Sequence, residues 1–322
     1  MNLYPLKFEP ILKERLWGGT KLKEVLNKPI SSDITGESWE LSAVEGDVSI
    51  VANGTIAGTS LKELIDEKAE ALLGKSVVRR FGKEFPILIK FIDAKQDLSI
   101  QLHPNDELAK KRHNSFGKTE MWYVMDADEG ANLIVGFNKD VTKDEYATGI
   151  ENDSLLDLLN YEAVREGDTF FINTGKIHAI GAGVLLAEIQ QTSDVTYRVF
   201  DFNRKDKEGN RRELHTDLAL DAIDYDQKDD FKVAYSNEVN SSNQMVDCPY
   251  FKTNFMHAIQ NITIDISEID SFIIYMCVDG EAQLTTETGS VSIIKGETVL
   301  IPAISERLQI TTNSAKLLEV TV

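Results

Sequence analysis

Four residues of types that bind divalent metal ions lie in strand-like segments between positions 97 and 178. Gln101 and His103 stand two positions apart in "DLSIQLHPND", so they share one face of an extended strand. Glu120 opens the apolar segment "EMWYVM", and we expect His178 to end the strand "GDTFFINTGKIH". Two imidazoles, a carboxylate and an amide suit Zn²⁺ or another borderline divalent ion. A solvated strand face with structural histidines is the alternative interpretation.

The elements that must position these residues are mostly strands. Apolar segments separated by Gly, Asn and Asp clusters predict an antiparallel barrel or sandwich, with strands within 83–94, 97–103, 119–127, 131–137, 168–174 and 184–191. Three segments have helical patterns, at 60–74, 142–160 and 215–223. The first has Ser60 as N-cap, Glu63 three residues later and Gly74 as its stop. The charged stretch 203–214 predicts an exposed loop.

Composition and charge exclude several classes of protein. The chain has 322 residues, 42% of them hydrophobic, and no apolar run reaches the ~18 residues of a membrane span. The net charge of −19 disfavours binding to nucleic acid or anionic membranes. The start has no pattern of a secretory signal, and two cysteines cannot form a disulfide framework. We therefore expect a cytoplasmic protein, a monomer or weak homo-oligomer.

An internal repeat divides the chain. "EGDTFFINTGKIH" at 166–178 matches "KGETVLIPAISER" at 295–307, with Gly167 aligned to Gly296 and an apolar run after each. The second copy has Arg307 in place of His178 and no counterpart of "QLHP", so the chemistry is expected in the first copy. A polar, acidic stretch near residue 235 suggests a boundary between a catalytic domain, 1–235, and a smaller degenerate domain, 236–322. We expect the second domain to bury apolar surface against the first.

Longer motifs carry a family resemblance. "GDTFFINTGKIH" resembles the second conserved motif of cupin barrels, with Asn173 at a position where proline is more usual. "FIDAKQDLSIQLHPND", "GKTEMWY", "GKIHAIGAG" and "EIQQTSDVTYRVFDF" together resemble the type I phosphomannose isomerases, most nearly their short bacterial form. The resemblance begins with "RLWGG" and "GESWELS" and extends to about residue 220. It implies a mainly β fold of two cupin (jelly-roll) barrels with a few inserted or peripheral helices.

The resemblance also implies a cofactor and a reaction. It assigns one zinc ion per chain to Gln101, His103, Glu120 and His178, with Thr119 where the family often has proline. The activity would interconvert mannose 6-phosphate and fructose 6-phosphate through an enediol. A proton must then move from C2 to C1 while charge on the neighbouring oxygens is stabilised.

Five further residues receive roles from the resemblance. Arg198 would stabilise the enediolate or bind the phosphate. Glu188 or Lys118 would move the proton, and the sequence does not decide between them. Ser99 and Arg204 lie where the family contacts phosphate or sugar.

Four of these residues, Lys118, Glu188, Arg198 and Arg204, also have a plain interpretation. A strand carboxylate, a loop lysine and arginines beside acidic residues are usually solvated. Three alternatives stay open for the function: a metal-dependent cupin oxygenase, a non-catalytic sugar-phosphate-binding protein, and a storage or structural bicupin. A phosphosugar is a dianion and the chain is acidic, so the isomerase hypothesis predicts a locally positive pocket.

Overall fold

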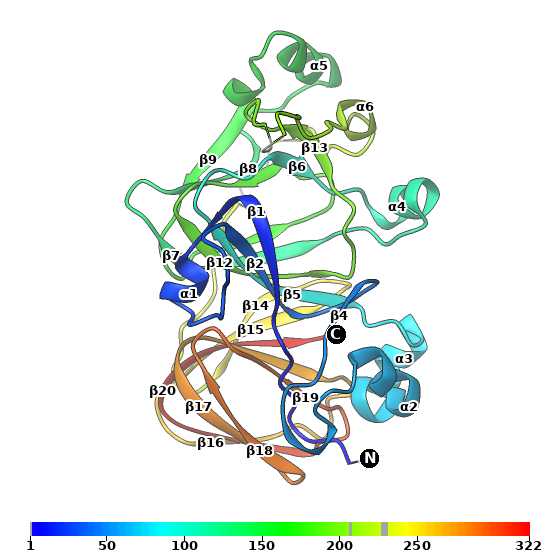
Figure 1. Ribbon diagram of the computed structural model, residues 1–322, viewed down its shortest axis with the longest axis vertical. Coiled ribbons are helices and arrows are strands. Elements are labelled where there is room, and N and C mark those ends of the chain that lie inside the picture. Colours follow the sequence, from blue (N-terminus) through cyan, green and yellow to red (C-terminus); the bar gives the residue numbers. More distant parts are fainter. Residues whose placement is uncertain (1, 206–207, 227–230) are drawn as a thin grey trace.

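The structure is a computed structural model that describes residues 2–205, 208–226 and 231–322. It confirms the expectation of a mainly β protein. Figure 1 shows two β-rich halves stacked along the long axis, with the short helices on the outside. The upper half contains the segments that carry every candidate metal ligand, and the lower half contains the C-terminal strands.

Two antiparallel sheets build the upper half. The six-stranded sheet has the order β1 (Ile11–Gly19), β2 (Thr35–Leu41), β5 (Ile87–Ala94), β12 (Val184–Gln191), β7 (Glu120–Ala127) and β10 (Thr169–Ile172). The five-stranded sheet has the order β13 (Tyr197–Phe200), β6 (Ile100–Leu102), β11 (His178–Ile180), β8 (Asn132–Phe137) and β9 (Leu159–Ala163). Trp122 and Phe170 of one sheet share a buried core with Leu133 and Val135 of the other. The candidate ligands therefore lie around the interior between the two sheets.

A third sheet builds the lower half. Its main path is β14 (Ser242–Asp247), β15 (Lys252–Ala258), β20 (Arg307–Thr321), β17 (Ile273–Thr286) and β18 (Gly289–Ile294), with β16 (Ile262–Asp265) on β20 and β19 (Thr298–Ile301) on β17.

This third sheet covers the outer face of the six-stranded sheet. Leu185 and Ile189 of β12 share one buried cluster with Phe255 and Met276 of the C-terminal sheet. Strand β12 is therefore buried on both faces, and all eight of its residues are buried, the polar Glu188, Gln190 and Gln191 among them. The expected burial of apolar surface between the two repeats is confirmed.

The repeat has the same backbone geometry in both copies. Gly167 and Gly296 have φ angles of +88° and +87°, which only glycine adopts readily. Gly167 N donates to Val124 O at 2.9 Å, and Gly296 N donates to Cys277 O at 2.8 Å. The strand that follows each turn, β10 or β19, has equal length, and the next strand begins at His178 or at Arg307.

The helices agree with the sequence only in part. Helix α2 (Leu61–Leu73) has the predicted capping box of Ser60 and Glu63 and ends at Gly74. The predicted helix at 142–160 is only α5 (Lys143–Glu151) because Asp153 takes a left-handed φ of +56°, and a 3₁₀ turn (Leu155–Leu158) follows. The predicted helix at 215–223 is only the single turn α6 (Thr216–Ala219). The sequence interpretation missed α1 (Lys21–Glu24), α3 (Lys75–Phe81) and α4 (Asp106–His113), as well as the short strands β3 (Ala43–Val44) and β4 (Asp47–Val48) and a 3₁₀ turn (Gly54–Ile56).

The N-terminal segment reaches the C-terminal sheet. Leu6 and Leu300 exchange backbone hydrogen bonds of 2.8 and 2.9 Å, and Phe272 N donates to Leu73 O at 3.1 Å. The division near residue 235 stays a prediction. Residues 227–230 of the acidic stretch and 206–207 of the charged loop lie outside the described residues. Within the described part of the chain, no helix has both the length and the apolar character needed to cross a membrane.

Candidate metal centre and its cavity

The ends of three strands bring two histidines and a glutamate together. His103 follows β6, Glu120 is the first residue of β7, and His178 is the first residue of β11. The expectation that His178 ends a strand is wrong, because β10 stops at Ile172 and the chain turns at Gly175, which has a φ of +82°. Gly175 N donates to His103 O at 2.8 Å, so this turn holds the start of β11 against the His103 segment.

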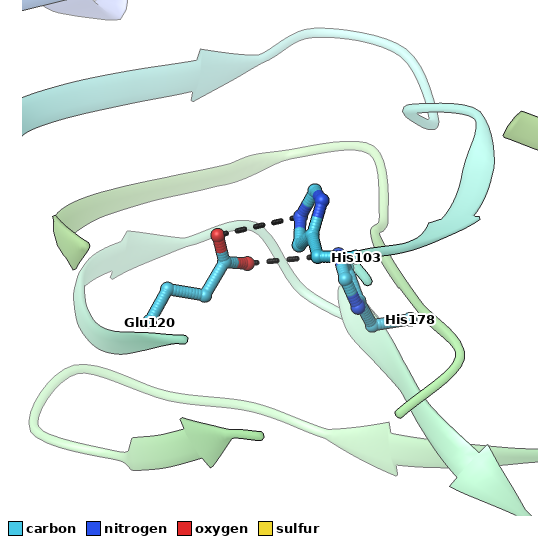
Figure 2. Close-up of side chains that lie close together, drawn as sticks. All are labelled: His103, Glu120 and His178. Atoms are coloured by element: carbon cyan, nitrogen blue, oxygen red, sulfur yellow. Dashed lines mark ion pairs between the residues drawn. The ribbon is translucent and has the colours of Figure 1, made fainter. Parts of the chain in front are cut away.

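The three side chains converge on one buried point. Figure 2 shows the Glu120 carboxylate directed at both imidazoles. His103 Nε2 lies 3.5 Å from Glu120 Oε2, and His178 Nε2 lies 3.5 Å from Glu120 Oε1. One potential ligand atom from each residue lies within 4.8 Å of the others, and all three residues are buried. Gln101 faces His178 across the β6–β11 pair.

The hydrogen bonds of the imidazoles leave their inner nitrogens free. His103 Nδ1 donates to Val195 O at 2.9 Å, and His178 Nδ1 donates to Lys176 O at 2.8 Å. Because a carbonyl only accepts, each Nε2 carries a lone pair. Neither Nε2 nor Glu120 Oε1 makes a hydrogen bond to a described residue. Such buried orphan atoms cost ~1–3 kcal/mol each unless a further partner binds them. The group therefore fits a divalent metal ion.

Electrostatics keep the donors in the states that bind metals. Burial lowers the pKa of His103 to about 4, with a further contribution from the Lys118 ammonium. Burial also lowers the pKa of His178. Burial alone would raise the pKa of Glu120, but Lys118 and the two histidines hold it well below its usual range. Neutral imidazoles beside a carboxylate are the forms that coordinate a metal.

Lys118 is buried, so its interpretation as a solvated loop residue is wrong. Its Nζ lies 3.1 Å from Glu120 Oε2, and only 6% of the residue is exposed. Burial by itself would lower the pKa of Lys118, but Glu120 and Glu188 raise it above its ordinary value. The lysine is therefore an ammonium ion beside the metal-binding group.

A cavity of about 500 Å³ adjoins this group. Of the candidate residues, Ser99, Gln101, Lys118 and Arg198 line it. Five cationic side chains line the cavity against three carboxylates: Arg15, Lys90, Lys118, Arg198 and Arg212 against Glu14, Glu37 and Asp194. The lining therefore has a positive surplus in a chain whose net charge is −19. The predicted positive pocket is present.

Comparisons with known proteins agree with the motifs. The family model for the catalytic domain of phosphomannose isomerase type I matches residues 5–135, and that for the mannose-6-phosphate isomerase cupin domain matches residues 241–322. Mannose-6-phosphate isomerase ManA of Bacillus subtilis is 35% identical over 305 residues, covering 94% of each chain. The chain belongs to the type I phosphomannose isomerase family.

Further relatives support this family assignment. The mannose-6-phosphate isomerase of Streptococcus mutans is 33% identical over 299 residues, covering 92% of each chain. The crystal structure of the mannose 6-phosphate isomerase from Bacillus subtilis superimposes with a TM-score of 0.90 at 32% identity and covers 99% of this chain and all of that one. The Salmonella typhimurium phosphomannose isomerase, 18% identical with a TM-score of 0.81, shares the fold.

Of the five candidate catalytic and substrate-binding residues of this family member, Glu188 and Arg204 do not line the cavity. Glu188 is buried behind it, with Oε1 3.1 Å from Lys90 Nζ and Oε2 accepting from Trp122 Nε1 at 2.9 Å. It is not the solvent-facing carboxylate of the plain interpretation. Arg204 is bound to the Asp201 carboxylate and the Asp97 carbonyl. Its role as a sugar or phosphate contact stays a prediction.

The sequence interpretation missed several charged residues of the cavity. Lys90 is the only charge in the apolar run "PILIKF", a signal that could have identified it. Glu37 accepts from Arg15 Nη2 at 2.9 Å and Trp39 Nε1 at 2.7 Å. Arg212 lies in a run of charges, where spacing does not distinguish one arginine from another.

Proposed function

We propose that this chain interconverts mannose 6-phosphate and fructose 6-phosphate. The observation that carries the proposal is the buried His103–Glu120–His178 group beside a cation-lined cavity. The two Nε2 atoms and Glu120 Oε1 have no hydrogen-bond partner among the described residues. The family assignment names the reaction class, and the geometry supplies both parts that the reaction needs. One part is a site for a divalent ion, and the other is a pocket for an anionic substrate.

We assign one Zn²⁺ per chain to His103, Glu120 and His178, with Gln101 as the fourth ligand. Gln101 lines the cavity, lies opposite His178 in the sheet and accepts from Ser99 Oγ at 3.4 Å. Two imidazoles with oxygen donors suit zinc, and these residues would hold the ion beside the cavity that Gln101 lines. When bound, the ion would polarise the oxygens on C1 and C2 of the open-chain sugar.

The cavity position of Lys118 favours it over Glu188 for direct contact with the sugar. Proton transfer requires a group within hydrogen-bond reach of C1 and C2. Lys118 lines the cavity beside the metal-binding group, whereas Glu188 is held by Lys90 and Trp122. A divalent ion bound at Glu120 would oppose the ammonium charge of Lys118, lower its pKa and so allow the amine to accept a proton. We therefore assign the proton transfer to Lys118, and we assign to Glu188 the role of holding Lys90 in place.

Arginines at the cavity wall supply the phosphate site. Arg198 donates through Nη1 to Glu213 O at 2.9 Å, and its buried Nε has no hydrogen-bond partner among the described residues. Arg212 is oriented by Asp201, which accepts from its Nε at 2.7 Å. Guanidinium groups bind phosphate oxygens in a bidentate manner, so these two arginines, together with Ser99, are the assigned phosphate contacts.

The alternatives have less support. Two histidines and a carboxylate would also suit the non-haem iron of an oxygenase. An oxygenase acting on an apolar substrate has no use for five cations around its cavity, and the family assignment favours the isomerase over a mere sugar-phosphate-binding or storage protein. We further propose a cytoplasmic location, because phosphosugars do not cross membranes and neither cysteine is in a disulfide.

Metal removal and replacement test the function. The protein is stripped with a chelator, and turnover of mannose 6-phosphate is measured in a coupled assay before and after Zn²⁺ is returned. We expect activity to be lost and then restored at one ion per chain, and Glu120→Gln to lose both zinc and activity. No turnover with zinc fully bound would contradict the proposal.

A second experiment assigns the proton transfer. In deuterated water, transfer through an enediol places solvent deuterium at C1 of fructose 6-phosphate. We expect Lys118→Met to abolish this incorporation and Glu188→Gln to slow it without abolishing it. The opposite pattern would assign the transfer to Glu188.

A further inference from the structure

One carboxylate outside the cavity connects the segments that carry the site. Asp106 begins α4, three residues after His103. Its Oδ1 accepts from Gly117 N at 2.8 Å and from Gln191 Nε2 at 3.2 Å. Gly117 precedes Lys118, and Gln191 ends the strand that contains Glu188. The side chain of Asp106 thus links the His103 segment, the Lys118–Glu120 segment and strand β12.

The backbone on both sides of Lys118 depends on this link. On one side, Gly117 packs so closely on the Asp106 backbone that an added Cβ would lie 2.7 Å from Asp106 N. On the other side, Thr119 N donates to Gln191 Oε1 at 2.8 Å, and Gln191 N donates to Thr119 O at 3.0 Å. Lys118 therefore projects from a short segment that Asp106 and Gln191 hold at both ends.

The C-terminal half of the protein completes the link. Tyr250, between β14 and β15, donates its hydroxyl to Asp106 Oδ2 at 2.7 Å, across 144 positions of sequence. Burial, with a further contribution from Asp106, raises the pKa of Tyr250 to about 12, so the phenol stays a donor at neutral pH. The chain thus has a continuous path of hydrogen bonds from the third sheet to the segment of Lys118.

We propose that Tyr250 and Asp106 are positioning residues through which the C-terminal domain holds Lys118 in the cavity. The inference rests on the proposed function for its kinetic consequence. Small displacements of a group that acts on the reacting atoms have large effects on rate, ~100-fold for about 1 Å. Within the described part of the chain, the group of residues able to hold a metal lies in the N-terminal half and not in the C-terminal repeat. Through this contact the C-terminal repeat would still contribute to catalysis.

A matched pair of tyrosine variants tests the proposal. Tyr250→Phe removes the hydroxyl bond to Asp106. Tyr235→Phe removes a similar half-buried bond, the hydroxyl of Tyr235 to Gly167 O at 2.7 Å, which does not lead to Lys118. We expect a similar small loss of Tm in both variants, but a ~10-fold lower kcat with KM within about twofold only in Tyr250→Phe. Equal kcat values for the two variants would overturn the proposal.

Two variants of the carboxylate separate positioning from folding. Asp106→Asn keeps an oxygen acceptor for Gly117 and Gln191, whereas Asp106→Ala removes it. We expect the kcat of Asp106→Asn to stay within about fivefold of the wild-type value. The kcat of Asp106→Ala should fall ~100-fold, although this variant should still bind one zinc ion. If kcat fell equally in both variants, the oxygen acceptor at position 106 would not matter for the rate, and the proposal would fail.

Amide hydrogen exchange distinguishes this proposal from the proposed function. Tyr250→Phe should increase exchange in the peptide covering residues 115–120, and Tyr235→Phe should not. This readout does not need turnover. If the wild-type protein has no isomerase activity but the exchange difference is present, the proposed function fails while the structural link stands. Unchanged exchange in an active enzyme would refute the link alone.

Discussion

The buried pair Lys90–Glu188 allows a quantitative test of how the cavity is held together. Lys90 Nζ lies 3.1 Å from Glu188 Oε1, and their side chains are only 6% and 4% exposed. Removing one partner of a buried pair leaves an uncompensated charge, at a cost of ~3–5 kcal/mol. Lys90→Met keeps the length of the side chain and removes the ammonium. We therefore expect it to lower the free energy of unfolding by about 3–5 kcal/mol.

A second substitution should recover part of this loss. The double variant Lys90→Met with Glu188→Gln has no buried charge at this position. Its glutamine oxygen can still accept the hydrogen bond that Trp122 Nε1 donates to Glu188 Oε2 at 2.9 Å in the wild-type protein. We expect the double variant to be about 2 kcal/mol more stable than Lys90→Met, because neutral replacements of a buried pair are much less costly. Lys139→Met is the matched control, since Lys139–Glu145 has a similar distance, 3.0 Å, but side chains 52% and 46% exposed. Lys139→Met should lower the free energy of unfolding by less than ~1 kcal/mol.

Denaturant unfolding measures these differences. Zinc-saturated proteins are unfolded in urea and followed by tryptophan fluorescence, and the midpoint and the m-value are compared for the same transition. A changed midpoint with an unchanged m-value shows that the free energy of unfolding has changed. The reasoning is refuted if Lys90→Met costs no more than Lys139→Met, or if the double variant is no more stable than Lys90→Met alone.

Three further predictions concern the phosphate site, the capping box and acid stability. Arg212→Ala should raise KM for mannose 6-phosphate ~10–100-fold with little change in kcat, as expected for lost hydrogen bonds to a charged group; steady-state kinetics with an unchanged KM would contradict this assignment. Ser60→Ala should cost about 1 kcal/mol of stability without affecting kcat, because it removes the N-cap of α2; denaturant unfolding and a parallel assay measure both. Burial alone would raise the pKa of Glu37, but Lys90 and Arg15 hold it below its ordinary value. The stability that Glu37 contributes is therefore present above that ordinary value and is lost as the pH falls below it. Glu37→Gln should make Tm less dependent on pH between about 5 and 3, and an unchanged slope would exclude this contribution.

Local patterns predicted the strands and the types of ligand well. Strands β5, β7, β8, β10 and β12 lie within the expected segments. A strand buried on one face has apolar residues at alternate positions, and a strand buried on both faces has them at most positions, so both kinds can be recognised from the sequence. The shared face of Glu120, Trp122 and Val124 follows from the twofold period of a strand, and the latter two lie in the core between the sheets. The capping box of α2 is a local feature and was predicted correctly. Helix α4 was missed, because its residues are almost all polar and carry no amphipathic period.

The amino-acid sequence by itself determined the strand periodicity, the repeat and the presence of His, Glu and Gln at positions able to meet. Only the tertiary structure decided which charges enter the cavity. It buried Lys118 beside Glu120, placed Glu188 behind Lys90 and brought Tyr250 to Asp106. The physical reason is that side-chain direction along a strand is a local property, whereas burial, ion pairing and hydrogen bonding depend on neighbours that are distant in sequence.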